Sequence, residues 1–201
     1  MISHKHKFIF VHINKTGGKS IELALGADLS ELHGQPRHVK HGTPHQWKYP
    51  KYWNTYFTFT FVRNPWSRAV SAYFFYLKRT QSKQKYLSAS RQNGFTEFIL
   101  QNPEFLKTKS SSMVDSLTHY IFTMCQMDWI VSDYDFIGRF ENLQEDFNVV
   151  CDKIGIPKQQ LPHKNKSKHK HYTEYYDDET KQIVAEKYAK DIEYFGYKFG
   201  E

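Results

Sequence analysis

Apolar residues along the chain fall into two patterns that alternate. Phe8–Val11 and Tyr56–Val62 are short runs of apolar, aromatic and β-branched residues, which is typical of strands buried in a parallel sheet. Phe136 and Ile137 form a third, shorter run. After each run the apolar residues recur every three or four positions, so each predicted strand leads into a predicted helix.

The predicted helices carry start and stop signals. Residues 19–25 precede Gly26, a residue type that commonly follows a helix end. Asn64 and Pro65 are a favoured N-cap and first helical residue, and their helix is expected to run to about Lys78. Further helices are expected at residues 95–101, at 117–127, from Asn142 to a stop at Gly155, and as one continuous final helix from Asp177 or Asp178 to Gly196.

Strands that alternate with helices predict the α/β class, as a P-loop-like central parallel sheet flanked by helices on both faces. The chain has 201 residues, and neither an internal repeat nor an interdomain linker interrupts the pattern. We therefore expect a single domain over residues 1–201, which is a common size for one domain.

The turn between the first strand and the first helix has the residue types of an anion-binding site. Its two glycines allow backbone N–H groups to approach an anion, and the following helix adds the positive end of its dipole. Two lysines supply charge and two hydroxyl groups supply further donors, a combination that is rare in an ordinary turn. The residues predicted to bind are Lys15, Thr16, Gly17, Gly18, Lys19 and Ser20.

One candidate for the anion is the triphosphate of ATP. A Walker A loop has the pattern Gly-x-x-x-x-Gly-Lys-Ser/Thr, and Gly18–Ser20 fits its end. Ile13 occupies the position of the first glycine, which weakens this interpretation. A P-loop kinase stays an alternative, and it predicts dependence on Mg²⁺ and tighter binding of ATP than of adenosine 3′,5′-bisphosphate (3′,5′-ADP).

A second polar turn follows the second long strand. Arg63 lies at the end of that strand, and Ser71 lies two turns into the next helix. Taken alone, this segment fits a capped helix with a surface arginine as well as it fits a second anion site.

Together the two turns resemble the sulfotransferases that use 3′-phosphoadenosine-5′-phosphosulfate (PAPS). Lys15–Ser20 is similar to their 5′-phosphosulfate loop, and Phe61–Ser71 is similar to their 3′-phosphate motif. The likeness is closest to carbohydrate sulfotransferases, which include heparan sulfate 2-O-sulfotransferase and the chondroitin and dermatan enzymes. Tyr134–Leu143 and Ala189–Tyr197 look like later blocks of that family, while Asn14 replaces its usual proline.

The resemblance implies an enzyme that moves the sulfuryl group of PAPS to a hydroxyl group of a carbohydrate by in-line transfer, without a metal. It implies that Lys15 contacts the bridging oxygen of the phosphosulfate and that Thr16 to Ser20 wrap the 5′-phosphate. It also implies that Arg63 and Ser71 hold the 3′-phosphate, the group that distinguishes PAPS from ATP.

The basic segment 163–171 has two interpretations. Its composition alone favours a solvated run of charge. The resemblance favours a flap over the nucleotide, in which Lys166 and Ser167 contact the donor. Arg139 and Glu141 either line the same cleft or form an ion pair.

The transfer needs a base for the acceptor hydroxyl, which is a histidine or a carboxylate. The segment before the second long strand offers His38, His41 and His45. His41 stands in a segment that resembles a histidine-containing segment of the family, so we expect it to be the base, with His38 as the second choice. His41 and His45 could also ligate zinc, but no further set of Cys and His completes a site. His12 is expected to pack or hydrogen-bond under the first turn.

The formal net charge of +7 favours anionic partners without choosing among them. A basic nucleic-acid-binding protein is a third interpretation, which predicts binding that weakens steeply with salt. It leaves both polar turns unexplained, so we expect no nucleic-acid partner. The sequence leaves the oligomeric state open.

No stretch approaches the roughly 20 apolar residues of a membrane span, and the N-terminal residues do not resemble a signal peptide. We therefore expect a cytoplasmic protein, or a soluble domain of a membrane-anchored parent. Cys125 and Cys151 lie in apolar stretches and are expected to be buried free thiols.

Overall fold

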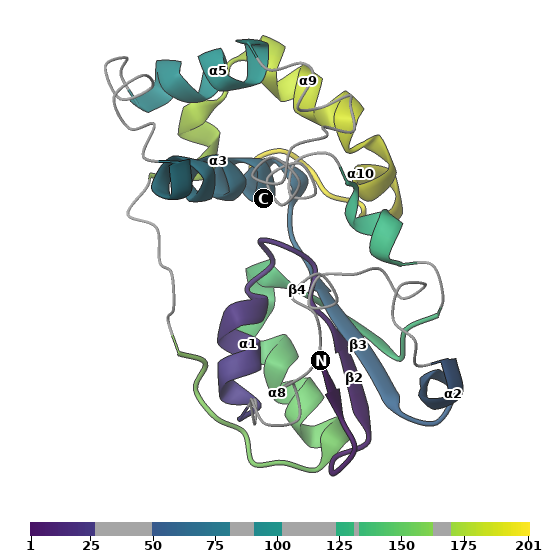
Figure 1. Ribbon diagram of the computed structural model, residues 1–201. Coiled ribbons are helices and arrows are strands. Elements are labelled where there is room, and N and C mark those ends of the chain that lie inside the picture. Colours follow the sequence, from purple (N-terminus) through teal and green to yellow (C-terminus); the bar gives the residue numbers. More distant parts are fainter. Residues whose placement is uncertain (27–49, 81–90, 102–123, 131–132, 163–169) are drawn as a thin grey trace. The chain divides into compact units, whose positions relative to one another are not determined.

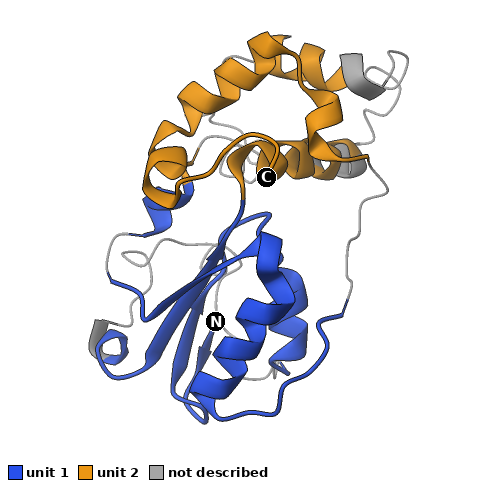
Figure 2. Ribbon diagram, turned by 180° about the vertical axis from the view of Figure 1, so that it is seen from behind, with its two compact units in different colours: residues 1–63, 126–166 blue, residues 64–125, 167–201 orange. Residues whose placement is uncertain are grey.

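The computed structural model describes residues 1–26, 50–80, 91–101, 124–130, 133–162 and 170–201 (Figure 1). The chain forms two compact units, which Figure 2 distinguishes by colour. Unit 1 comprises residues 1–63 and 126–166, and unit 2 comprises residues 64–125 and 167–201. The expectation of a single domain over residues 1–201 stays a prediction.

Unit 1 contains the sheet, whose strands follow one another in the order β1-β2-β3-β4. Strands β2, β3 and β4 are parallel, and the short β1 pairs with β2 in the antiparallel direction. The predicted α/β class with a mostly parallel sheet and flanking helices is thereby confirmed. The strands are β1 (Ile2–Ser3), β2 (Phe8–Val11), β3 (Phe57–Val62) and β4 (Phe136–Arg139).

The sheet buries both of its faces, as the continuous apolar runs predict. Phenylalanines of β2 and β3 pack with residues of α1 (Gly18–Ala24) and α8 (Leu143–Ile154), and both helices lie on one face (Figure 1). This core consists of Phe8, Phe10, Ile21, Phe59, Phe61, Phe147, Val150, Cys151, Ile154 and Leu161. Residues of β2 and β3 that alternate with these phenylalanines are also buried, including Ile9, Val11 and Thr60.

Shorter elements complete unit 1, and helices make up most of the described part of unit 2. In unit 1 these are α2 (Pro50–Trp53), η3 (Gln126–Trp129) and η4 (Phe140–Asn142). In unit 2 they are α3 (Pro65–Thr80), α5 (Arg91–Gln101), η5 (Tyr172–Tyr175), α9 (Asp178–Lys187) and α10 (Ala189–Phe195).

Capping residues explain where several helices begin and end. The Asn64 side-chain oxygen accepts from the backbone N–H groups of Trp66 and Ser67, so α3 begins as predicted. Asp177 and Thr180 form a reciprocal capping box at the start of α9. Gly155 adopts a left-handed conformation at the end of α8, which confirms that predicted stop.

The final helix is not continuous, which corrects the prediction of one helix. It is divided at Tyr188, whose φ of −109° and ψ of 27° are not helical. The Cys125 thiol contacts the carbonyl oxygen of Lys187 at 3.5 Å, directly before this break. A side chain that inserts at a helix carbonyl is a recognised cause of such bends.

One further expectation meets the structure only in part, and another is met. Of the predicted helix 117–127, residues 117–123 lie outside the described residues, and Gln126–Trp129 forms a 3₁₀ turn. Both cysteines are buried free thiols, as predicted. Burial is the main cause that raises the pKa of the Cys151 thiol. Among the described helices, none is long and apolar enough to cross a membrane.

Candidate functional site

The loop between β2 and α1 has a backbone shape that suits an anion. Lys15 has a φ of 72° and Gly17 a φ of 85°, both in the left-handed region, whereas Thr16 between them does not have a positive φ. Alternation of handedness turns successive backbone N–H groups toward one side and creates an anion-binding concavity. Because α1 has only seven residues, this loop rather than a helix dipole is the main feature of the site.

Interactions within the loop hold this shape. The Thr16 hydroxyl donates to the carbonyl oxygen of Ile13 at 2.9 Å, and Thr16 has no exposed area. The Ser20 N–H donates to the carbonyl oxygen of Gly17 at 2.9 Å. The hydroxyl of Thr16 therefore stabilises the turn, and the predicted contribution of Thr16 to anion binding rests on its backbone N–H.

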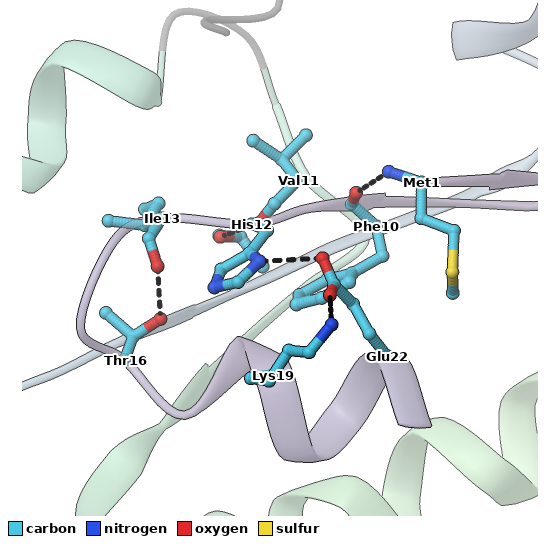
Figure 3. Close-up of polar contacts among 9 residues, drawn as sticks. Met1, Phe10, Val11, His12, Ile13, Thr16, Lys19 and Glu22 are labelled. Atoms are coloured by element: carbon cyan, nitrogen blue, oxygen red, sulfur yellow. Dashed lines mark hydrogen bonds and ion pairs between the residues drawn. The ribbon is translucent and has the colours of Figure 1, made fainter. Parts of the chain in front are cut away.

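The two glycines are required for different reasons. Gly17 needs its left-handed conformation, and a Cβ there would lie only 2.9 Å from a methyl carbon of Leu143. Gly18 is helical, but a Cβ at this position would overlap the imidazole ring of His12. His12 therefore lies against the end of the loop (Figure 3), as its expected place under the first turn requires.

We expect Gly18→Ala to destabilise the protein by about 1–3 kcal/mol, the usual cost of an overpacked site. The free energy of unfolding in urea measures this loss. The His12→Ala background is the control, because removal of the ring leaves room for the new methyl group. An equal loss in both backgrounds would show that the His12 ring is not the cause.

The two loop lysines have different surroundings. Lys15 is half-buried. The Lys19 side chain is half exposed, and its Nζ atom lies 3.4 Å from Oε2 of Glu22. An ion pair with so exposed a partner contributes little to stability, so Lys19 can exchange this contact for a ligand at low cost.

Arg63 connects the second polar turn to the first. It ends up beside the loop because β3 is the parallel neighbour of β2. Its Nη1 atom donates to the carbonyl oxygen of Lys15 at 3.3 Å, and its guanidinium carbon lies 3.9 Å from the centre of the Phe140 ring. The structure therefore brings Lys15 and Arg63 together, as expected if both bind one ligand.

Gln126 supports Arg63 in a way that the sequence does not reveal. Its Oε1 accepts from the Arg63 N–H at 2.8 Å, and its Nε2 donates to the Arg63 carbonyl at 2.8 Å. The buried amide thus pairs with the backbone at the end of β3 as a neighbouring strand would. An isolated glutamine far along the chain gives no local signal for this role.

The other predicted site residues lie on several elements or outside the described residues. Ser71 lies on α3 in unit 2, whereas Arg63 belongs to unit 1. Glu141 is exposed, and the backbone N–H of Arg139 donates to Oδ2 of Asp146 at 2.6 Å. The remaining candidates lie outside the described residues, and their roles stay predictions: His38, His41, His45, Lys166 and Ser167.

Known proteins similar to this chain include carbohydrate sulfotransferases. Carbohydrate sulfotransferase 9 of Homo sapiens is 26% identical over 95% of this chain and 47% of its own length. Carbohydrate sulfotransferase 14 of Danio rerio is 28% identical over 64% of this chain and 35% of its own length. An uncharacterized protein of Archaeoglobus fulgidus is 31% identical over 54% of this chain and 76% of its own length.

The chain thus spans less than half the length of the two carbohydrate sulfotransferases that it matches. The sequence model of the sulfotransferase family matches residues 1–198, which is nearly the whole chain and includes both polar turns. The protein therefore belongs to the sulfotransferase family.

Proposed function

We propose that this protein transfers the sulfuryl group of PAPS to a hydroxyl group of a carbohydrate. The observation that carries the proposal is the β2–α1 loop, whose alternating backbone and two lysines suit a phosphosulfate group. Arg63 reaches this loop from the next strand, so a second cationic group is available to the same nucleotide. Family membership favours this donor over other anions.

The residues that would hold the donor form two groups, one for the 5′-phosphate and one for the 3′-phosphate. The loop from Thr16 to Lys19 suits the 5′-phosphate through its backbone N–H groups. Ser20 is assigned through its hydroxyl group, because its N–H donates to the carbonyl oxygen of Gly17. Arg63 and Ser71 are assigned to the 3′-phosphate, which is the group absent from ATP. Lys166 and Ser167 are assigned as further donor contacts on the strength of the family resemblance.

PAPS, when bound, supplies an activated sulfuryl group. By analogy with phosphoryl transfer, the protein contributes mainly positioning and charge stabilisation. Lys15 stabilises the negative charge that develops on the leaving nucleotide. His41, with His38 as the second candidate, accepts the proton of the attacking hydroxyl. This scheme uses no metal.

The acceptor class has separate support. Two of the similar proteins bear the name carbohydrate sulfotransferase. The net charge of +7 also suits an anionic polysaccharide, which a basic protein attracts at long range.

Thermal shift with three nucleotides tests the donor. We expect 3′,5′-ADP to raise the melting temperature most, since it has both phosphate ends of PAPS, while 5′-AMP and ATP lack the 3′-phosphate. A larger shift with ATP in the presence of Mg²⁺ would support the kinase interpretation instead. Transfer of label from [³⁵S]PAPS to a panel of desulfated polysaccharides then tests the acceptor. If 3′,5′-ADP binds and every polysaccharide stays unlabelled, the carbohydrate assignment is wrong.

We expect Arg63→Ala to weaken binding of 3′,5′-ADP by about 10–100-fold, which corresponds to the loss of hydrogen bonds to a charged group. Binding of 5′-AMP should weaken less, because Arg63 is assigned to the 3′-phosphate, which 5′-AMP lacks. Isothermal titration calorimetry measures both affinities. Arg63→Lys is the control that keeps the charge but loses the planar fork of donors. An equal loss of affinity for both nucleotides would show that Arg63 supports the loop and does not contact the 3′-phosphate.

A further inference from the structure

A buried imidazole–carboxylate pair lies directly beneath the β2–α1 loop. Nδ1 of His12 is 2.8 Å from Oε1 of Glu22, and the two residues are 8% and 4% exposed (Figure 3). The second carboxylate oxygen of Glu22 accepts from Lys19 at 3.4 Å. One carboxylate therefore contacts both the ring beneath the loop and a lysine at its end.

The contacts of the His12 ring define which edge faces the loop. Glu22 has only acceptor atoms when ionised, so Nδ1 of His12 carries the hydrogen and donates it. The Phe10 ring is stacked with the imidazole, with 13° between the planes and 5.8 Å between the centres. The opposite edge, with Nε2 and Cδ2, faces Gly18 so closely that no Cβ fits there.

Stability alone is a weak explanation for this pair. Burial of an ionisable pair costs desolvation, and a well-packed apolar pair often stabilises a protein as much or more. A carboxylate commonly fixes the orientation of a histidine whose other ring nitrogen binds a ligand or transfers a proton. Here that other nitrogen, Nε2, lies at the end of the proposed donor loop.

We propose that His12 contacts the donor: with both ring nitrogens protonated, it donates from Nε2 to the anionic 5′-phosphosulfate end. Glu22 is then the positioning residue that orients His12 toward this group. This inference rests on the proposed function, because it names a further contact in the same donor site. It adds a histidine to a site that the sequence defines by lysines, glycines and hydroxyl groups.

Two amide variants separate the donor contact from a structural role. Asn in place of His12 can retain a donor near the position of Nδ1, whereas Gln reaches toward the position of Nε2. We expect His12→Asn to weaken 3′,5′-ADP binding at least tenfold and His12→Gln to retain affinity within about threefold, in line with loss or retention of a charge-assisted hydrogen bond. Adenosine 3′-monophosphate, which lacks the 5′-phosphate, should bind both variants as it binds the unmodified protein.

Isothermal titration calorimetry with the two nucleotides measures these affinities, and urea unfolding shows that each variant is folded. Normal affinity of His12→Asn for 3′,5′-ADP would overturn the inference, and so would equal losses for both nucleotides. If His12→Asn does not fold, Glu22→Gln provides the same comparison: a loss for 3′,5′-ADP alone supports the inference, and normal affinity overturns it. Asp152 lies on α8 and forms an exposed ion pair with Lys158, so Asp152→Asn, which removes this carboxylate, serves as the matched control.

Binding of 3′,5′-ADP to the unmodified protein distinguishes failure of the His12 contact from failure of the proposed function. If it does not bind 3′,5′-ADP, the proposed function itself fails. If it binds 3′,5′-ADP and only the His12 comparison fails, the sulfotransferase proposal stands without this contact.

Discussion

Lys15→Ala should lower turnover by about 10²–10³-fold, the usual effect of removing one group that stabilises charge in a transition state. The affinity for 3′,5′-ADP should fall much less, because the relevant charge develops only as the sulfuryl group leaves. The substitution keeps the hydrogen bond that Arg63 donates to the backbone carbonyl oxygen of residue 15. Alanine preserves that carbonyl and leaves the loop in place.

Single-turnover measurements with labelled PAPS separate the chemical step from donor binding. Lys19→Ala is the matched control, since the half-exposed Lys19 is assigned to binding and its loss should raise KM more than it lowers kcat. If Lys15→Ala raises only KM and leaves kcat intact, Lys15 is a binding residue without a role in the transition state.

His41→Ala should lose on the order of 10²–10⁴-fold in turnover, the usual contribution of a positioned base. His41 precedes β3, which ends at Val62, and ligands of α/β proteins bind at the carboxyl edge of the sheet. A base must be neutral to accept a proton, so activity should rise with pH as the imidazole loses its proton. The acid limb of the profile of kcat/KM against pH should therefore disappear in His41→Ala, while nucleotide binding is retained.

His38→Ala is the control for this assignment. If it loses turnover while His41→Ala does not, the base is His38. If both variants stay active, the base lies outside this segment, and a carboxylate is the next candidate. Glu22 suits that role poorly, because it is buried and bonded to both His12 and Lys19. Glu141 is exposed and is the better choice.

The sequence predicts elements whose signals are local. Phe8–Val11 forms a strand with the predicted bounds, because a run buried on both faces is continuous in the sequence. The caps at Asn64 and Asp177 also depend on neighbouring residues only. The break at Tyr188 is not predictable in this way, since the thiol that contacts the helix there comes from Cys125.

The same distinction applies to the site. The residue types of the loop predict an anion site. They also predict a left-handed backbone at the glycines, but they give no sign that Lys15 is left-handed too, as the structure shows. The contact of Arg63 with the Lys15 carbonyl joins residues that follow two different strands, and the contact of Gln126 with Arg63 spans 63 positions. No spacing rule within one segment reveals such pairs, which follow from the order of strands in the sheet.

At Lys15, the left-handed backbone lowers the stability of the fold, whereas the side chain is the one proposed to stabilise the leaving nucleotide. A residue with a side chain loses roughly 1–2 kcal/mol in this conformation, whereas glycine adopts it freely. Substitution by glycine would relieve that cost, and it would also remove the ammonium group to which we assign stabilisation of the leaving nucleotide. We therefore expect a selection for heat resistance to enrich glycine at position 15, and the proposed role of Lys15 predicts that the more stable variant has lower turnover. Engineering of this protein for thermal stability should therefore leave Lys15 unchanged.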